Sequence, residues 1–284
     1  MRRYCYRGYK AERIPIDVTH VTIDPSVTTI KKEAFGYCTS MLSVRMGDHV
    51  KRIESQAFIV CTRLKFVQLS RSLEFIGYGA FWRCESLVAL FLPPTVIEIG
   101  DFAFYDCRSL KVLKFPTGIQ LANIGKNVID SCQTLFNRTI VRYERNVNGF
   151  VTAESDFAVK YWLVALRNDI FPFHAICHKT YVSAEMVNEY INRFGNDCVY
   201  DVDCYGMSAL HILALNPHAS TEAILSCFDA NENAVFDEDD EGYTPIDYAR
   251  HYNVQGLLAL LEALIIKWSV SDTYESMASR KRKR

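Results

Sequence analysis

The first half of the chain repeats itself every 23 residues, and no other feature of the sequence constrains the fold as strongly. Four cysteines mark the repeat at this spacing, and a fifth follows after a slightly longer step. The clearest columns of the repeat are Cys38, Cys61, Cys84, Cys107 and Cys132; Phe35, Phe58, Phe81, Phe104 and Ile129; and Ile30, Ile53, Ile76, Ile99 and Ile124. Because one unit of this length cannot bury its apolar face alone, neighbouring units must stack into a continuous core.

A short apolar alternation follows each cysteine. In two successive units it reads Leu87, Leu90, Leu92 and Leu110, Leu113, Phe115. This alternation predicts a short strand in which every second side chain points inward, and strands of successive units should lie parallel. We expect the alanine–phenylalanine segment before each cysteine to form a turn or short helix on the opposite side. The cysteines are interpreted as small buried side chains; a metal ladder or disulfides are the alternative.

The full pattern, V-x-x-I-x-x-x-A-F-x-x-C-x-x-L, resembles the BspA-like leucine-rich repeat family over about residues 18–140. The resemblance implies a curved solenoid that serves protein–protein contact, and the family's better-known members act at cell surfaces. Residues 1–17 are expected to cap the N-terminal end. This segment lacks the apolar region of a secretory signal, so we expect an intracellular protein, cytoplasmic or nuclear.

The residues between the inward-facing leucines are candidates for binding other proteins. The candidate binding residues are Arg45, Phe66, Gln68, Phe91, Val112 and Lys114. Aromatic and arginine side chains are favoured anchors at interfaces, which draws attention to the two phenylalanines. Two alternatives remain open: isolated exposed apolar residues are common, or a neighbouring segment covers them.

The 23-residue columns stop near residue 140, and residues 141–165 are interpreted as a connector. From residue 166 to 268 a second, longer period aligns Pro172, Ala209 and Pro245. Serine or threonine precedes the expected helices as plausible N-caps, at Ser183, Ser220 and Thr244. We expect the helix of residues 257–268 to cap the end of this array.

The second pattern resembles the ankyrin repeat, whose T-P-L-H motif begins the first helix of each unit. Here the motif reads Thr244, Pro245, Ile246 and Asp247 in one unit, with His211 at the histidine position of the preceding unit. The resemblance implies protein binding through hairpin tips and inner helices, and a buried hydrogen bond for His211. The predicted fold class is therefore an α+β repeat protein: a leucine-rich solenoid with short parallel strands, then an all-α ankyrin-type solenoid.

Catalytic chemistry is not indicated by any motif in the chain. The segment His174, Cys177, His178 is compatible with zinc, with Cys198 and Cys204 as further donors, but the spacing fits no common zinc pattern. Phosphate-binding, dinucleotide-binding, nucleophile-elbow and zinc-protease motifs are lacking. We predict no enzyme activity, no cofactor and no metal.

The composition favours protein partners over nucleic acid or membrane. Formal net charge is −1, which gives no global attraction to anionic polymers or lipids. The exception is the basic end of the chain, predicted to be a disordered tail from residue 269, with Arg280, Lys281, Arg282, Lys283 and Arg284 as a possible nuclear-targeting signal. The sequence thus predicts a non-catalytic protein-interaction scaffold. The alternative is a nuclear regulatory protein with weak nucleic-acid contact through this tail.

Overall fold

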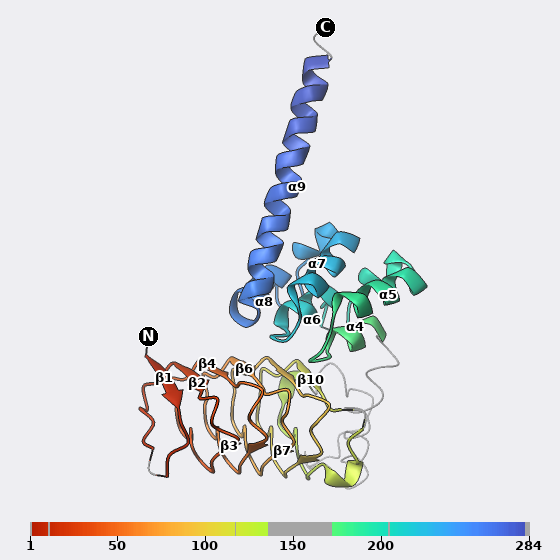
Figure 1. Cartoon of the computed structure of the whole chain (residues 1–284). Helices are drawn as coiled ribbons and strands as arrows, with labels where there is room; N and C mark the ends of the chain where they lie inside the picture. Colours follow the sequence, from red (N-terminus) through yellow and green to blue (C-terminus); the bar gives the residue numbers. More distant parts are fainter. Residues whose placement is uncertain (1, 11, 117, 136–171, 204, 282–284) are drawn as a thin grey trace. The chain divides into compact units, whose positions relative to one another are not determined.

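The repeat of the first half folds into stacked coils, each of which contributes strands to parallel ladders (Figure 1). The computed structural model describes residues 2–10, 12–116, 118–135, 172–203 and 205–281, with the backbone alone for Lys114 and residues 268–281. The chain divides into two units, Met1–Thr180 and Tyr181–Arg284. Each unit is described below by itself.

The first ladder of the N-terminal unit combines the apolar alternation after the repeat cysteines with two strands that precede Cys38. Its strands are β1 (Arg3–Tyr6), β2 (His20–Ile23), β4 (Ser43–Arg45), β6 (Phe66–Gln68), β8 (Ala89–Phe91) and β10 (Val112–Lys114). All described pairs are parallel, and β6 and β8 are not joined by a described ladder. From β2 onward each paired residue lies opposite its equivalent in the next repeat, as Val44 does opposite Val67. The pairing of β1 with β2 joins Arg3 to His20, so the first strand extends the sheet although its coil is shorter than the others. The parallel strands predicted from the sequence are confirmed.

The isoleucine column forms the second ladder. Its two-residue strands are β3 (Thr29–Ile30), β5 (Arg52–Ile53), β7 (Phe75–Ile76) and β9 (Glu98–Ile99), again all parallel. Ile124 continues the column through a single bridge to Ile99. Every isoleucine of this column is buried, so both ladders supply side chains to one core.

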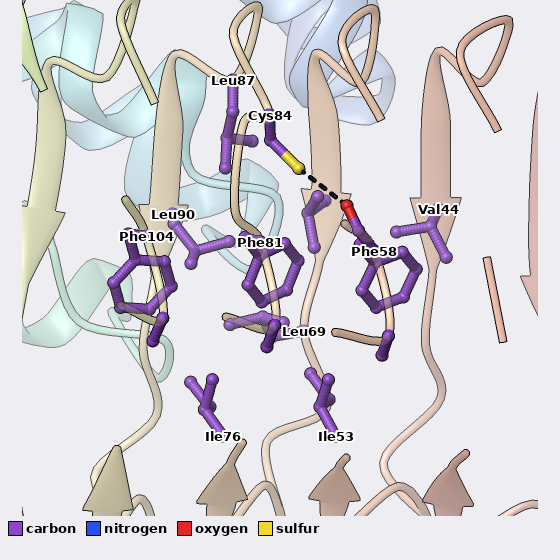
Figure 2. Packing of buried hydrophobic residues seen from close by; sticks show 14 of the residues in the cluster. Val44, Ile53, Phe58, Leu69, Ile76, Phe81, Cys84, Leu87, Leu90 and Phe104 are labelled. Carbon is purple, nitrogen blue, oxygen red and sulfur yellow. Dashed lines mark hydrogen bonds between the residues drawn. The ribbon is translucent and has the colours of Figure 1, made fainter. Parts of the chain in front are cut away.

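The phenylalanine column stacks along the axis of the solenoid (Figure 2). Ring centroids lie 5.0 Å apart between Phe35 and Phe58, and 5.1 Å apart between Phe58 and Phe81. Phe104 continues the stack at 5.8 Å from Phe81, and Tyr6 begins it at 5.0 Å from Phe35. The segments that carry these rings are turns without regular helix, which satisfies the predicted turn. Aromatic stacking thus adds to area burial in fixing the register of successive coils.

The cysteine column carries a polar function that the sequence did not reveal. Each of four thiols donates a hydrogen bond to the carbonyl oxygen of the phenylalanine in the preceding coil, as Cys84 does to Phe58 at 3.3 Å (Figure 2). The other three bonds join Cys61 to Phe35, Cys107 to Phe81 and Cys132 to Phe104, at 3.1–3.2 Å. Burial raises the pKa of Cys38 to about 11 and raises those of Cys61 and Cys84 well above their ordinary value. These thiols are therefore structural and unreactive.

A thiol-labelling experiment checks this assignment. Cys5 lies exposed on β1, whereas Cys84 is fully buried. At neutral pH, N-ethylmaleimide should modify Cys5 rapidly and Cys84 only at the rate at which the unit unfolds, because the thiolate is the reactive form. Peptide mass spectrometry measures both rates in one sample. Equal rates for the two residues without denaturant would contradict the assignment.

The C-terminal unit consists of paired helices. Their bounds are α5 (Ala184–Phe194), α6 (Ala209–Leu215), α7 (Thr221–Ala230), α8 (Pro245–Tyr252) and α9 (Val254–Lys281). A short helix, α4 (Pro172–Cys177), lies within the N-terminal unit. Helix α6 packs on α8, and α7 packs between α5 and α9, so the helices form two adjoining rows.

The predicted helix N-caps are confirmed. Ser183, Ser220 and Thr244 each accept a hydrogen bond from the backbone N–H three residues on, which satisfies one of the free donors of the first turn. Asn253 caps α9 in the same way, by accepting from the N–H of Gly256 at 2.9 Å. The capping residues Ser183, Ser220 and Asn253 therefore mark equivalent positions in α5, α7 and α9.

Buried polar side chains join successive helix pairs. His211 accepts from the backbone N–H of Ser208 through Nδ1, so its Nε2–H donates to the carbonyl oxygen of Tyr243, at 3.1 Å. Burial lowers the pKa of His211, which keeps the ring neutral. Asn253 donates to the carbonyl oxygens of Asn216 and Ala219. The buried hydrogen bond expected for His211 is confirmed.

Helix α9 forms the end of the described chain. Its backbone is helical to Lys281, beyond residue 269, where the sequence predicts the start of a disordered tail. Leu258, Leu261 and Ile265 are exposed on α9, and its role as the cap of the array stays a prediction. The predicted connector of residues 141–165 lies outside the described residues. Within the described part of the chain, no helix has both the length and the apolarity needed to cross a membrane.

Candidate protein-binding surface

The first ladder presents an outward face formed by two columns of side chains. Strand register aligns Arg3, His20, Ser43 and Phe66 in one column and Cys5, Thr22, Arg45 and Gln68 in the other. The 23-residue repeat continues the first column with Ala89 and Val112 and the second with Phe91 and Lys114, which β8 and β10 pair in the same way. We call this surface the strand face. All six candidate binding residues lie at strand-face positions, although β6 and β8 are not joined by a described ladder, and their role in binding stays a prediction.

Burial divides the strand face into two halves. Toward β10 the positions are covered: Phe66 and Phe91 are each 4% exposed, and Val112 is fully buried. Burial at Phe66, Phe91 and Val112 therefore agrees with the alternative that a neighbouring segment covers this part of the face. The ring of His178, just after α4, lies 6.0 Å from the ring of Phe91, so a later segment of the N-terminal unit packs against this half. The structure describes the backbone of Lys114 in β10 and not its side chain.

Toward β1 the strand face is open. Arg3, Thr22 and Arg45 are exposed, while His20 and Gln68 are half-buried. The Arg45 guanidinium lies over the ring of Phe66, 5.3 Å from its centroid. This cation–π contact holds the Arg45 side chain in place at the border between the two halves. The contact leaves the positive charge of the guanidinium without a counter-charge. We call the positions Arg3, His20, Thr22, Ser43, Arg45 and Gln68 the open half.

The open half is positively charged. In the described part of the chain neither Arg3 nor Arg45 forms an ion pair, and the strand face carries no carboxylate. Burial first, and then charges that include Arg3 and Arg45, hold the pKa of His20 below its ordinary value, which places both guanidinium groups near this ring. Asp17, in the loop between β1 and β2, pairs with Arg2. The surface therefore offers unsatisfied positive charge to a ligand.

Sequence reasoning missed the part of the open half nearest the N-terminus. Arg3, His20 and Thr22 belong to it, but the coil from β1 to β2 is shorter than the repeat, so β1 falls outside the 23-residue columns. A usable signal existed, because the alternation of Tyr4 and Tyr6 with Arg3 and Cys5 has the period of a strand.

The remaining candidate residues do not assemble into a site. Among described residues, no group of three or more histidine, cysteine or acidic side chains is placed to hold a metal, and Cys204 lies outside those residues. The nuclear-targeting candidates Arg280 and Lys281 end α9 with side chains that are not described, and Arg282, Lys283 and Arg284 lie outside the described residues. Nuclear targeting stays a prediction.

The architecture of the N-terminal unit is that of a leucine-rich repeat solenoid. Residues 15–139 match the family model described as the BspA type leucine rich repeat region, in six copies. This confirms the family predicted for that part of the chain and adds one copy to the five units counted from the cysteines. Leucine-rich repeat proteins commonly mediate protein–protein interaction, and the family is one of non-enzymatic repeat proteins.

Three solved structures are similar to this chain at 26% identity. A leucine-rich repeat protein of T. pallidum aligns over 41% of this chain and 56% of its own, with a TM-score of 0.39. A leucine-rich cell surface protein from Faecalibacterium prausnitzii A2-165 aligns over 43% and 32%, with a TM-score of 0.39. A leucine-rich repeat protein from Bacteroides ovatus ATCC 8483 aligns over 47% and 36%, with a TM-score of 0.35. The alignment thus spans between about a third and just over half of each solved chain. A search of curated proteins gave no match.

Proposed function

We propose that this protein is a non-catalytic interaction scaffold whose open half binds an acidic, extended segment of a partner protein. The observation that carries the proposal is the pair of unpaired guanidinium groups, Arg3 and Arg45, on a strand face that has no carboxylate among its described residues. Arginine is suited to this role because its planar fork binds a carboxylate through two hydrogen bonds.

The shape of the open half favours an extended ligand. Its charged and polar positions recur across neighbouring parallel strands, which lie about 4.8 Å apart. Thr22 lies on the strand between those of the two arginines, and Ser43 and Gln68 flank Arg45. These three side chains supply hydroxyl and amide groups for main-chain hydrogen bonds. Because each coil is fixed by its neighbours, the surface is formed before binding and loses little conformational entropy.

The proposal is tested by the binding of a labelled acidic peptide. The probe is a fluorescein-labelled peptide of alternating glutamate and threonine, and its binding to the full chain is followed by fluorescence anisotropy. Arg45→Glu should weaken binding about tenfold or more, or about 1.4 kcal/mol, since it replaces an attractive charge by a repulsive one. Binding should also weaken as salt is raised.

A matched control comes from the second ladder. Arg52 of β5 lies over the ring of Phe75 in the next coil, 4.0 Å from its centroid, so it repeats the geometry of Arg45 over Phe66 away from the strand face. Arg52→Glu makes the same change in net charge and should leave binding within about twofold. Equal losses for the two variants, or no binding of the peptide at low salt, would refute the proposal.

We also infer that α5 to α9 are ankyrin-type repeats and form a second binding array. The inference is supported by two turns of the same kind, in which Asp203 and Asp239 each accept from backbone N–H groups two and four residues on. Gly206 and Gly242 follow them with φ of +72° and +79°, a conformation that favours glycine. The later turn donates a hydrogen bond to the earlier one, from the N–H of Asp240 to the carbonyl oxygen of Tyr205. Two arrays in one chain would allow bivalent capture of partners.

A further inference from the structure

Helix α9 carries an apolar stripe that nothing in the described part of the chain covers. Val254, Leu258, Leu261 and Ile265 are between 40% and 65% exposed and are spaced four, three and four residues apart. Side chains at this spacing lie on one face of a helix. The stripe is about 16 Å long at the rise of an α-helix. In a repeat array an apolar face of this kind is normally covered by a neighbouring unit.

The preceding helix shows what covers the equivalent face. Capping residues Ser220 of α7 and Asn253 of α9 define the alignment of the two helices, which makes Leu261 the equivalent of Phe228. Phe228 is fully buried, and Lys267 of α9 lies over its ring at 4.9 Å. The position that α9 covers on α7 is therefore left open on α9 itself. A further helix on this face of α9 would bury these side chains, as α9 buries Phe228 of α7.

We propose that the covering helix is α9 of a second copy, packed antiparallel across a two-fold axis. The spacing of four, three and four residues reads the same in both directions. When the midpoint between Leu258 and Leu261 lies on the axis, each apolar side chain meets another: Leu258 lies opposite Leu261 of the second copy, and Val254 lies opposite Ile265 of the second copy. A two-fold interface needs such self-complementarity, because the same patch serves both partners.

The small area of the stripe and the polar residues beside it indicate a weak dimer. Four side chains from each copy form a small contact, below the area of tight permanent dimers, so association is weak and concentration-dependent. Glu262 and Gln255 lie beside the stripe and stay exposed, whereas Lys267 already bonds with Asp229 and Glu232 within its own chain. Two joined copies would present two open halves, and a partner with two acidic segments would gain from both.

Sedimentation equilibrium of the full chain tests the proposal. The weight-average mass should rise from one chain toward two between about 1 and about 300 µM. Leu258→Glu and Leu261→Lys should each abolish this rise, because each places a charge opposite a leucine. Gln255→Glu introduces the same acid beside the stripe and should leave the rise unchanged.

Mixing the two charged variants tests the antiparallel arrangement. An equimolar mixture of Leu258→Glu and Leu261→Lys should associate again, because residue 258 of one copy faces residue 261 of the other and the two charges attract. Association of the wild-type chain without rescue in the mixture would overturn the antiparallel pairing. A mass of one chain at every concentration, or equal loss with Gln255→Glu, would overturn the second copy as occupant. Circular dichroism of each variant confirms that the helices are intact.

Discussion

Replacement of Phe81 by alanine is expected to lower the free energy of unfolding of the N-terminal unit by about 3–5 kcal/mol. Phe81 is fully buried at the centre of the aromatic stack, with ring centroids 5.1 Å from Phe58 and 5.8 Å from Phe104. Alanine removes both stacking contacts and leaves a cavity that the flanking coils cannot close, because their spacing is fixed by strand pairing. The loss should therefore reach the upper range for core truncations.

The labelling of Cys84 as a function of urea measures this loss in the N-terminal unit alone, since Cys84 becomes reactive only when that unit opens. Phe81→Leu keeps most of the apolar volume and should cost only about 1–2 kcal/mol. Ile97→Ala alters a side chain that is 61% exposed and should shift the midpoint little. A Phe81→Ala variant no less stable than Ile97→Ala would show that the stack contributes nothing.

The core of the N-terminal unit could be predicted from the sequence because periodicity alone identifies equivalent residues. Columns such as that of Phe58 and Phe81 recur at one spacing, and stacking of identical units places every column inside or outside together. The thiol hydrogen bonds could not be predicted in this way. Their acceptors are backbone carbonyl oxygens, and the position of a carbonyl depends on turn geometry rather than on residue type.

The turn geometry itself has no clear sequence signature. Two columns adopt positive φ in successive coils. One runs through Glu33, Gln56, Gly79, Phe102 and Asn127, and the other through Tyr37, Val60, Arg83, Asp106 and Ser131. Only one of these ten residues is glycine, the residue that takes this conformation without strain. The stacked coils impose the conformation on the others, which is a tertiary effect that local propensity does not record.

The exposure of the strand face could not be derived from the alternation. A period of two residues separates inward from outward side chains, but whether the outward side meets water depends on distant parts of the chain. Here His178, from beyond the last repeat, packs against Phe91. The change from polar residues such as Arg45 to apolar residues such as Phe91 and Val112 along the face is the signal of this covering.

The end of the helical unit shows the same limit. The apolar stripe of Leu258 and Leu261 has a helical period, so the helix was predictable. A helical period is the same whether the apolar stripe is buried within its own chain or is exposed and free to bind a partner. Burial in the folded unit was needed to distinguish the two.

Replacement of Gly100 by alanine is the second large effect expected. A Cβ atom at this position would lie 2.6 Å from the backbone N of Tyr78 and 2.8 Å from the carbonyl carbon of Gly77, in the preceding coil. Neither atom can move without separating two coils that are joined by the ladder of β7 and β9. The variant should lose about 3 kcal/mol of unfolding free energy, as overpacking against rigid surroundings does.

Gly118→Ala is the matched control, because a Cβ atom there would have no neighbour within 4 Å. The labelling of Cys84 in urea again measures the stability of the N-terminal unit. Gly118→Ala should leave the midpoint nearly unchanged, or raise it slightly through the lower entropy of the unfolded chain. Comparable losses in the two variants would mean that the coils tolerate a Cβ atom at Gly100 by moving apart. The glycines at this position would then be unnecessary for the close approach of successive coils, and their recurrence at Gly77, Gly100 and Gly125 would need another cause.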